Sequence, residues 1–306
     1  MTSPGAAGAA LRLTAEVRAA LDARRPVVAL ETSVFAQGLP IPNNRDAARR
    51  MMAAVAEHGA IAALVAVIDG VPTLGLTGAE LERFLAREGI SKVSARDLGV
   101  TIATGRSGAT TVAATLALIA GTSIGVFATG GIGGVHRENA LDESADLGEL
   151  ARTPAVVVCA GAKAILDLPA TLERLETLGV PVLGYRTREF PAFFCQSSGL
   201  PLSASVESVA EVRDIVRAHR GLGRRQAVLV VQPPPAEHAL PPDLVEEAVG
   251  HAIAAARAAG IRGAAVTPFL LAAMERATGG RSLTANLALL EANAGLAAQI
   301  ATALLT

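Results

Sequence analysis

The sequence contains very little cysteine. Only Cys159 and Cys195 occur among its 306 residues, too few for a disulfide scaffold or a four-cysteine zinc site. The first ten residues lack the basic start and the long apolar core of a secretory signal. We therefore expect a cytoplasmic protein in which both cysteines are free thiols.

Charge is also scarce. Charged residues make up 18% of the chain, the formal net charge is −1, and 51% of the residues are hydrophobic. A near-neutral chain lacks the basic footprint of a nucleic-acid-binding protein, so we expect no nucleic-acid partner. A chain this apolar can bury a large core, which excludes an intrinsically disordered protein.

Long unbroken hydrophobic runs are missing as well. The longest uncharged stretch extends from Ser107 to Val135, but Gly121-Thr122-Ser123 divides it, and four of residues 130–134 are glycine. A membrane-spanning helix needs about 20 mostly apolar residues in one run. The stretch is more typical of a helix, a turn, a strand and a loop, so we expect no membrane partner.

Short apolar runs alternate with helical patterns along the chain. Most runs are apolar throughout, which is typical of strands covered on both faces in a parallel or mixed sheet. Readable helix ends support the alternation: Thr77 and Glu80 form a capping box that opens a helix over Glu80–Arg87, and Gly89 follows it. The predicted strands are Val27–Leu30, Ala63–Ile68, Val100–Ala103, Ile124–Ala128, Val156–Cys159, Val182–Tyr185, Val228–Val231 and Ala264–Thr267.

This alternation predicts an α/β fold. The residues alone leave two architectures open, a layered sheet and a β/α barrel with eight strands. No internal repeat and no long linker divides the chain. We expect one compact domain over residues 16–306, preceded by a disordered or loosely attached segment at residues 1–15.

The 27 basic residues include only two lysines, Lys92 and Lys163. Arginine keeps its proton in a protein, whereas lysine can become the neutral amine that attacks a carbonyl. Lys163 follows the apolar strand Val156–Cys159, where we expect a helix to begin, among small neighbours. Ligands bind outside the carboxyl ends of strands in open α/β sheets, so Lys163 is a candidate nucleophile. The alternative is a helix-start lysine whose amine reaches water.

Lys92 lies in a segment whose strand-like alternation places Lys92, Ser94 and Arg96 on one face. A lysine, a hydroxyl and an arginine together suit a phosphate group. Thr111 precedes the next predicted helix, Val112–Ala120, whose free backbone N–H groups form a second candidate anion site. In the alternative, this threonine only caps the helix.

The loop Thr129–His136 is rich in glycine, which allows close approach of the backbone to a ligand. Its spacing matches neither the dinucleotide fingerprint nor a Walker A loop. The acidic cluster that follows the loop comprises Glu138, Asp142, Glu143 and Asp146. Carboxylates with water suit Mg²⁺ or Mn²⁺ rather than zinc, so this cluster is a candidate metal site. The alternative is a solvated acidic loop leading into a helix capped by Asp142 or Ser144.

Two further sites depend on strand ends and a helix face. Glu31 directly follows the strand Val27–Leu30, where a carboxylate is a candidate general acid–base. Asn286 and Asn293 share one face of an otherwise apolar helix. A buried amide needs partners, so Asn286 either binds a ligand or holds a loop in place.

Taken together, these residues resemble the pseudouridine-5′-phosphate glycosidase family from about Leu21 to Thr302. The resemblance is specific because many blocks match in the same order. The matching blocks are Ala29–Ser33, Gly38–Pro40, Gly70–Leu76, Lys92–Leu98, Gly108–Thr115, Thr129–Arg137, Ser144–Leu147, Val158–Leu168, Glu189–Phe193, Thr267–Leu271 and Ser282–Asn293.

The resemblance implies a layered α/β subunit with helices on both faces of the sheet, assembled as a homotrimer, and a divalent metal, usually manganese. It implies that Lys163 is the Schiff-base nucleophile, Glu31 the proton donor and Asp142 the metal ligand. The substrate-binding positions that it implies are Lys92, Thr111, Val112, His136, Ser144, Ala145, Asp146 and Asn286.

The activity that the resemblance implies is the reversible cleavage of pseudouridine 5′-phosphate to uracil and ribose 5-phosphate by a glycosidase or lyase acting on a C–C bond. Because uracil C5 is a poor leaving group, we expect Lys163 to open the ribose ring as a lysine–sugar imine. The loop from Glu138 to Glu143 departs from the family pattern and is about two residues shorter. Two alternatives therefore stand: an enzyme that joins ribose 5-phosphate to another carbon nucleophile, and a catalytically silent sugar-phosphate-binding protein.

Overall fold

The computed structural model describes residues 11–137, 139–261 and 266–306. Among the described residues, strands occur between Arg12 and Val231, and only helical elements follow. They are β1 (Arg12–Leu13), β2 (Val27–Glu31), β3 (Ile61–Ile68), β4 (Val71–Leu74), β5 (Ile90–Val93), β6 (Ser107–Thr110), β7 (Val126–Ala128), β8 (Val135–His136), β9 (Asn139–Glu143), β10 (Val156–Cys159), β11 (Leu166–Asp167), β12 (Val182–Tyr185), β13 (Ala204–Val206) and β14 (Val228–Val231).

Helices separate most of these strands. The α-helices are α1 (Ala15–Asp22), α2 (Asn43–Glu57), α3 (Gly78–Ala86), α4 (Leu98–Ala103), α5 (Val112–Ile119), α6 (Ala145–Leu150), α7 (Leu168–Thr177), α8 (Val209–Gly221), α9 (Pro242–Ala258), α10 (Val266–Ala277) and α11 (Arg281–Leu305). Three short segments are a π-helix η1 (Val34–Gly38) and the 3₁₀ helices η2 (Ala95–Asp97) and η3 (Ala236–His238).

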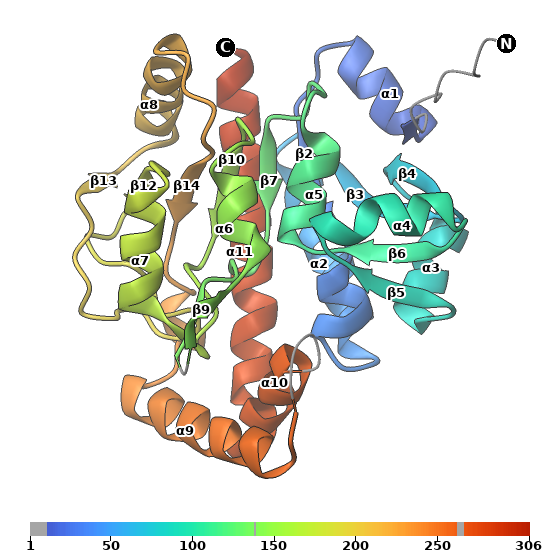
Figure 1. The fold of residues 1–306 in the computed structure, drawn as a ribbon. Helices are drawn as coiled ribbons and strands as arrows, with labels where there is room; N and C mark the ends of the chain where they lie inside the picture. The colour runs from blue at the N-terminus through green and yellow to red at the C-terminus, as the bar shows by residue number, and fades with distance from the viewer. Residues whose placement is uncertain (1–10, 138, 262–265) are drawn as a thin grey trace, which may run out of the picture.

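One large open sheet forms the centre of the molecule, with the strand order β1-β4-β3-β2-β7-β10-β14-β12-β13 (Figure 1). The run from β3 to β13 is parallel, and β4 and β6 lie antiparallel to β3. Strands β11, β8 and β9 form a second, small antiparallel sheet. The open order confirms the layered α/β fold and excludes the barrel.

Helices cover both faces of the large sheet (Figure 1). Helices α5 and α6 pack together on one face, and α11 packs on the other face against α2, α8, β7 and β10. All four residues of β10 and all five of β2 are buried, as predicted for strands covered on both sides. The two cysteines are buried free thiols, and burial raises the pKa of Cys159 to about 12.

Strand order reverses between β2 and β7. From β2 the chain crosses to β3 on one side, whereas from β7 it proceeds to β10 on the other side. In an open α/β sheet, such a reversal leaves a crevice at the carboxyl ends of the two strands. This crevice is where the fold places a ligand.

Two predicted strands are wrong. Val100–Ala103 belongs to helix α4, which Asp97 precedes, and Val100 is 56% exposed rather than part of the core. Thr101 bonds its hydroxyl to the Asp97 carbonyl and is thereby held in the helix. In Ala264–Thr267, the last two residues begin α10, and the first two lie outside the described residues.

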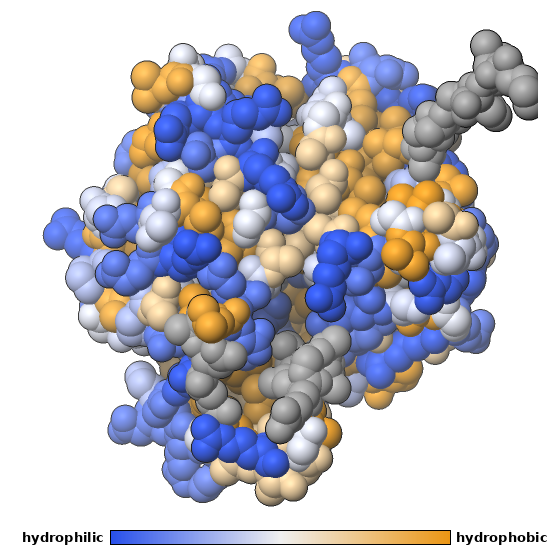
Figure 2. Space-filling model, in the orientation of Figure 1, coloured by the Kyte–Doolittle hydropathy of each residue, from blue (hydrophilic) through white to orange (hydrophobic). Residues whose placement is uncertain are grey.

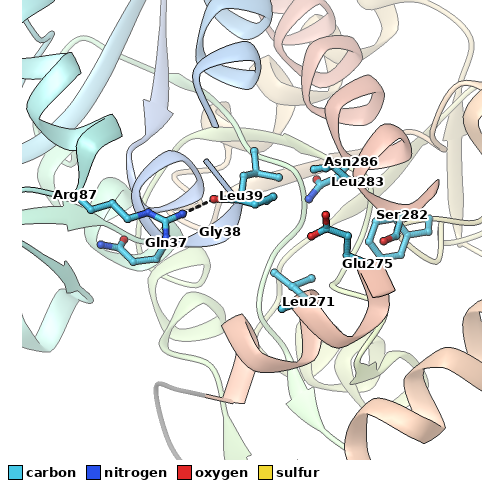
Figure 3. Close-up of a pocket in the computed structure, with 12 residues that line it drawn as sticks. Gln37, Gly38, Leu39, Arg87, Leu271, Glu275, Ser282, Leu283 and Asn286 are labelled. Carbon is cyan, nitrogen blue, oxygen red and sulfur yellow. Dashed lines mark hydrogen bonds between the residues drawn. The ribbon is translucent and has the colours of Figure 1, made fainter. Parts of the chain in front are cut away.

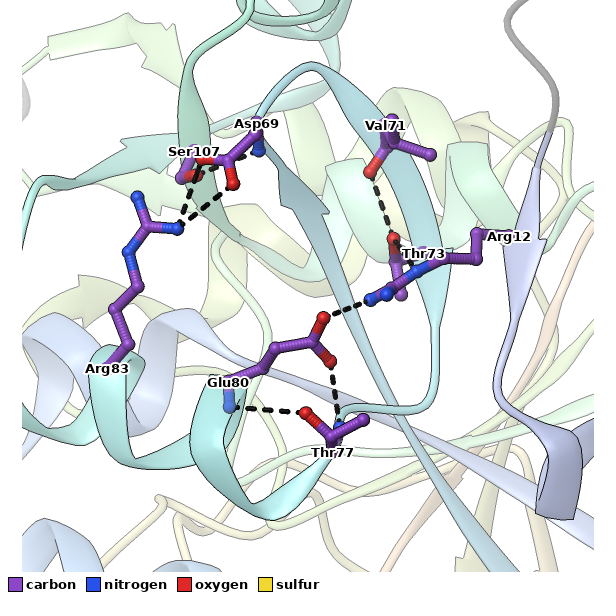
Figure 4. A network of polar contacts seen from close by, with 8 residues as sticks. All are labelled: Arg12, Asp69, Val71, Thr73, Thr77, Glu80, Arg83 and Ser107. Carbon is purple, nitrogen blue, oxygen red and sulfur yellow. Dashed lines mark hydrogen bonds and ion pairs between the residues drawn. The ribbon is translucent and has the colours of Figure 1, made fainter.

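The expected loose attachment of residues 1–15 does not hold for residues 11–15. Strand β1 pairs with β4, and Arg12 forms a 2.7 Å ion pair with Glu80 beside the Thr77 capping box (Figure 4). Thr14 then accepts the Val17 N–H as the N-cap of α1. Residues 1–10 lie outside the described residues.

Helix α11 is long and apolar enough, by length and composition, to cross a membrane. In the fold, 67% of its most apolar window is buried, and the helix runs through the middle of the molecule (Figure 1). Its contacts with α2, β2, β7 and β10 are those of a core helix.

Candidate active site

Three adjacent parallel strands bring the predicted catalytic residues together. Glu31 ends β2, Thr129 follows β7, and Lys163 lies shortly after β10. Strand β7 pairs with both neighbours, so the three chain segments leave the sheet side by side at the point where strand order reverses. Glu31 and Lys163 both line two adjoining cavities of about 220 and 50 Å³. Figure 2 shows the surface hollowed at this end of the sheet.

Glu31 is buried and held by two hydroxyls. Ser33 Oγ donates to Glu31 Oε2 at 2.6 Å, and Thr129 Oγ1 donates to Glu31 Oε1 at 2.5 Å. Burial raises the pKa of Glu31 above its ordinary value of 4.5, and the positive charge of Lys163 and these two hydrogen bonds oppose the rise. Its carboxyl group therefore retains a proton to higher pH than an exposed glutamate does.

Lys92 reaches the same cavities from β5, which β6 connects to the edge of β3. Burial and then the charge of Lys163 lower the pKa of Lys92, and Glu31 and Asp146 oppose this shift. The two lysines of the chain thus lie within electrostatic range of each other and of Glu31.

We predicted that Lys163 stands at the start of a helix, but it lies in a loop. The chain makes a parallel bridge between Ile132 and Ala162, and Lys163 N donates to Ile132 O at 3.1 Å. Helix α7 begins only at Leu168, with Asp167 as its N-cap. Gly161 has φ +83°, and a Cβ there would lie 2.3 Å from the Pro191 carbonyl, so only glycine fits this turn.

Asp146 takes the place that we predicted for an anion at the start of α5. Its Oδ1 accepts the Ala113 N–H at 2.9 Å, and its Oδ2 accepts the Gly133 N–H at 2.8 Å. The protein's own carboxylate therefore occupies part of the helix N-terminus. Thr111 caps the helix through Ala114 N, and both Thr111 and Val112 line the larger cavity.

The side chains that we predicted to bind a phosphate also line the larger of these two cavities. Lys92, Ser94 and Arg96 all contribute, although the strand ends at Val93 and the short helix η2 places Arg96. The three side chains thus share one cavity, but β5 ends at Val93, so strand alternation does not place Ser94 and Arg96 there.

The glycine-rich loop and the turn after it hold the site together. Ser144 is the N-cap of α6 and accepts the Asp146 N–H at 3.2 Å, as the alternative reading of the acidic loop proposed. A Cβ on Gly133 would lie 2.3 Å from Ser144 Oγ, which explains a glycine there. Ser144, Asp146 and half-buried His136 line the larger cavity. Ala145 is exposed and does not line it.

Asp142 lies exposed on β9 and outside the lining of these cavities. Within the described residues, no three His, Cys, Asp or Glu side chains gather closely enough to hold a metal ion. A cation at Asp142 would therefore take most of its ligands from water and substrate. Mg²⁺ and Mn²⁺ accept such a donor set, because they commonly bind through one or two carboxylates.

The two asparagines of α11 have different roles. Asn293 Nδ2 donates to the Thr129 carbonyl at 2.8 Å, and its Oδ1 accepts from Gln232 at 3.0 Å, so it ties the glycine-rich loop to the helix. Asn286 is 7% exposed and lines the smaller cavity. Its side chain makes no hydrogen bond to any residue that the structure describes.

The residues that the sequence reasoning missed lie at the far side of the cleft. Phe193 and Leu271 line the smaller cavity together with Gln37 of the π-helix η1. π-Helices are rare and occur often at functional sites. Helix η1 contacts α10, which is far from it in the sequence. The local sequence pattern of either segment does not predict this contact.

Comparisons with known proteins identify the family of this chain. Residues 16–303 match the family model described as Indigoidine synthase A like protein, and the chain belongs to that family. Within it, the chain belongs with the pseudouridine-5′-phosphate glycosidases. It is 61% identical over 293 residues to the protein of that name from Gemmatimonas aurantiaca, covering 96% of both chains.

Two solved structures share the fold over nearly the whole chain. The prealnumycin C-glycosynthase AlnA, solved in complex with ribulose 5-phosphate, has a TM-score of 0.89 and 39% identity, covering 96% of this chain and 97% of its own. An indigoidine synthase A-like protein from Thermotoga maritima has a TM-score of 0.88 and 38% identity, covering 97% of both. The resemblance seen in the sequence is thus confirmed.

Proposed function

We propose that this protein reversibly cleaves the C–C glycosidic bond of pseudouridine 5′-phosphate, giving uracil and ribose 5-phosphate. The observation that carries the proposal is the meeting of Lys163 with buried Glu31 in one cleft, at adjacent strand ends. The name shared by close relatives supports the substrate.

The chemistry starts at the anomeric carbon. Lys163 Nζ, as a neutral amine, bonds to C1′, the bond from C1′ to the ring oxygen breaks, and Glu31 supplies the proton that this oxygen takes up. The nitrogen, now an ammonium, gives up one proton, and its lone pair then forms the C=N bond of a protonated imine as the C1′–C5 bond breaks. The electron pair of that bond goes to uracil C5, which takes a proton. Water adds to the imine and releases ribose 5-phosphate and the free amine.

The end of the cleft lined by Lys92 and Arg96, named the cationic end although Asp97 and Asp146 also line it, would hold the phosphate. Lys92 and Arg96 supply positive charge, and Ser94 and Thr111 supply hydroxyls. Asp146 already accepts the N–H groups of Ala113 and Gly133, so we assign it the positioning of the glycine-rich loop and the turn at Ser144 and Ala145. His136 and Asn286 complete the substrate-binding set.

Asp142 would hold a divalent cation, Mn²⁺ in this proposal. When bound, such an ion supplies positive charge that orients and polarises substrate oxygens. The protein would act in the cytoplasm as a homotrimer with small-molecule substrates.

Reductive trapping tests the proposal. Incubation with ribose 5-phosphate and borohydride should give a stable sugar adduct on Lys163, located by mass spectrometry of peptides. Lys163→Arg keeps the charge but forms no imine, and serves as the control. Absence of an adduct in the wild-type protein would contradict the covalent mechanism and favour a silent sugar-phosphate-binding protein.

A second function is favoured by one comparison. AlnA is described as a C-glycosynthase. Joining ribose 5-phosphate to another carbon nucleophile in this protein would use the same covalent step at Lys163. Turnover with uracil, compared with other aromatic carbon nucleophiles, separates the two. Efficient reaction with uracil supports the first function, and reaction only with another nucleophile supports the second.

A further inference from the structure

A third cavity, of about 260 Å³, continues the cleft beyond the catalytic residues (Figure 3). It shares Gln37, Gly38, Leu271 and Asn286 with the small cavity that contains Glu31 and Lys163. It shares no lining residue with the 220 Å³ cavity at the cationic end. The three spaces therefore follow one another, with the catalytic residues between the cationic end and this outer cavity.

This order fixes the direction of the substrate, given the proposed function. The phosphate lies at the cationic end near Lys92 and Arg96, and C1′ lies at Lys163. The base is attached to C1′, so it must extend in the opposite direction. That direction leads through the small cavity, past Thr129 and Phe193, toward the outer one.

Two unpaired polar side chains face each other across the outer cavity. Glu275 extends from α10, and Asn286 extends from α11 toward it (Figure 3). Among the described residues, neither side chain has a hydrogen bond or an ion pair. Asn286 is more than nine-tenths buried and Glu275 is half-buried. Asn286 is a buried residue whose amide has no partner in the described part of the chain, and buried polar groups without partners are costly. This amide, with the unpaired Glu275 carboxylate beside it in the same cavity, indicates a ligand that supplies the missing hydrogen bonds.

We infer that Glu275 determines base specificity by accepting a hydrogen bond from a ring N–H of uracil while Asn286 donates to the adjacent carbonyl. A uracil attached through C5 presents N–H, C=O and N–H along its opposite edge. A carboxylate only accepts, and an amide N–H₂ only donates, so the pair matches this edge. In a uracil nucleotide linked through nitrogen, one of these N–H groups is lost.

Steady-state synthesis from uracil and ribose 5-phosphate tests the inference, with Glu275→Gln as the variant. The variant keeps the side-chain shape but presents an N–H₂ group in place of one acceptor oxygen. We expect the KM for uracil to rise about tenfold, with the KM for ribose 5-phosphate and the borohydride adduct on Lys163 unchanged. Glu247→Gln, at an exposed position on the neighbouring helix α9, is the matched control and should behave as wild type.

Methylated bases provide a second readout. The wild-type enzyme should prefer uracil by about tenfold or more over whichever of 1-methyluracil and 3-methyluracil lacks the N–H that Glu275 accepts. Glu275→Gln should narrow that preference. An unchanged KM for uracil, or equal rises in both KM values, overturns the inference. A wild-type protein that forms the adduct but turns over no uracil overturns the proposed base, and this result appears before any variant is made.

Discussion

The two ends of the cleft are built differently. At the reacting end, Glu31 and Asp146 are buried and each accepts two hydrogen bonds from the frame of the sheet and the loops next to it. At the far end, Glu275 and Asn286 face an open cavity, and neither has a hydrogen-bonding partner among the described residues.

Under the proposed function, this difference separates the residues of the reaction from those that recognise the base. Preorganised donors and acceptors lower the cost of reaching a transition state, because no reorganisation is needed during the reaction. Unpaired groups instead form their hydrogen bonds only when a ligand binds. Substitutions at the reacting end should therefore affect turnover, and those at the far end should affect the choice of base.

Loss of the amine should have the largest effect. Lys163→Ala removes the nucleophile, and we expect turnover to fall about 10⁴-fold or more, with no borohydride adduct. Stopped assays of uracil consumption measure the first change, and mass spectrometry measures the second. Adduct formation at Lys92 in this variant would show that the roles of the two lysines are reversed.

Glu31→Gln should be the next most damaging change, with turnover reduced by about 10²- to 10⁴-fold. In the wild type, activity that needs the Glu31 proton should fall as pH rises through the raised pKa of this group. The glutamine variant should lack that fall in its pH–rate profile. A wild-type profile without it would remove Glu31 from the role of proton donor.

The same variant should gain stability. A carboxyl with a raised pKa favours the protonated folded state, so the folded protein loses stability as pH rises above 4.5 and the group ionises. Thermal unfolding should therefore give a higher Tm for Glu31→Gln than for wild type at pH 8. A lower Tm would mean that the hydrogen bonds from Ser33 and Thr129 outweigh the cost of burial.

Metal removal should have an intermediate effect. Chelation with EDTA is expected to lower turnover by about 10²-fold, with recovery on addition of Mn²⁺. Asp142→Asn should require more Mn²⁺ for half-maximal activity, whereas Glu143→Gln, next to it, should not. Full activity after exhaustive chelation would contradict a role for the cation.

The smallest expected effect concerns the support of the glycine-rich loop. Asn293→Leu leaves the Thr129 carbonyl and the Gln232 amide without their partner and should lower the free energy of unfolding by about 1–3 kcal/mol. Denaturant titration measures this loss. The Lys163 adduct should still form, because Asn293 lines none of the three cavities of the cleft.

Much of the reacting end could be predicted from the sequence. Continuous apolar runs marked β2, β7 and β10, and parallel strands place their carboxyl ends at one edge of the sheet. The sequence alone therefore places Glu31 and Lys163 at the same edge of the sheet. The tertiary setting of Lys163 could not be predicted, because the bridge between Ile132 and Ala162 replaces the expected helix start.

The other failures have physical causes of the same kind. Val100–Ala103 resembles a strand in composition, but it belongs to the short helix α4, in which Val100 faces solvent. The outer cavity depends on α10 and α11 meeting η1, a contact between segments far apart in sequence. Periodicity within one segment carries no information about such a meeting.

The reversal of strand order between β2 and β7 also bears on how catalytic competence arises. Glu31 and the Lys163 amine belong to distant parts of the chain, and β7 must join β2 to β10 before they meet. A partly folded chain holds neither group in register with the other. Under the proposed function, reactivity toward sugar aldehydes therefore requires the completed sheet.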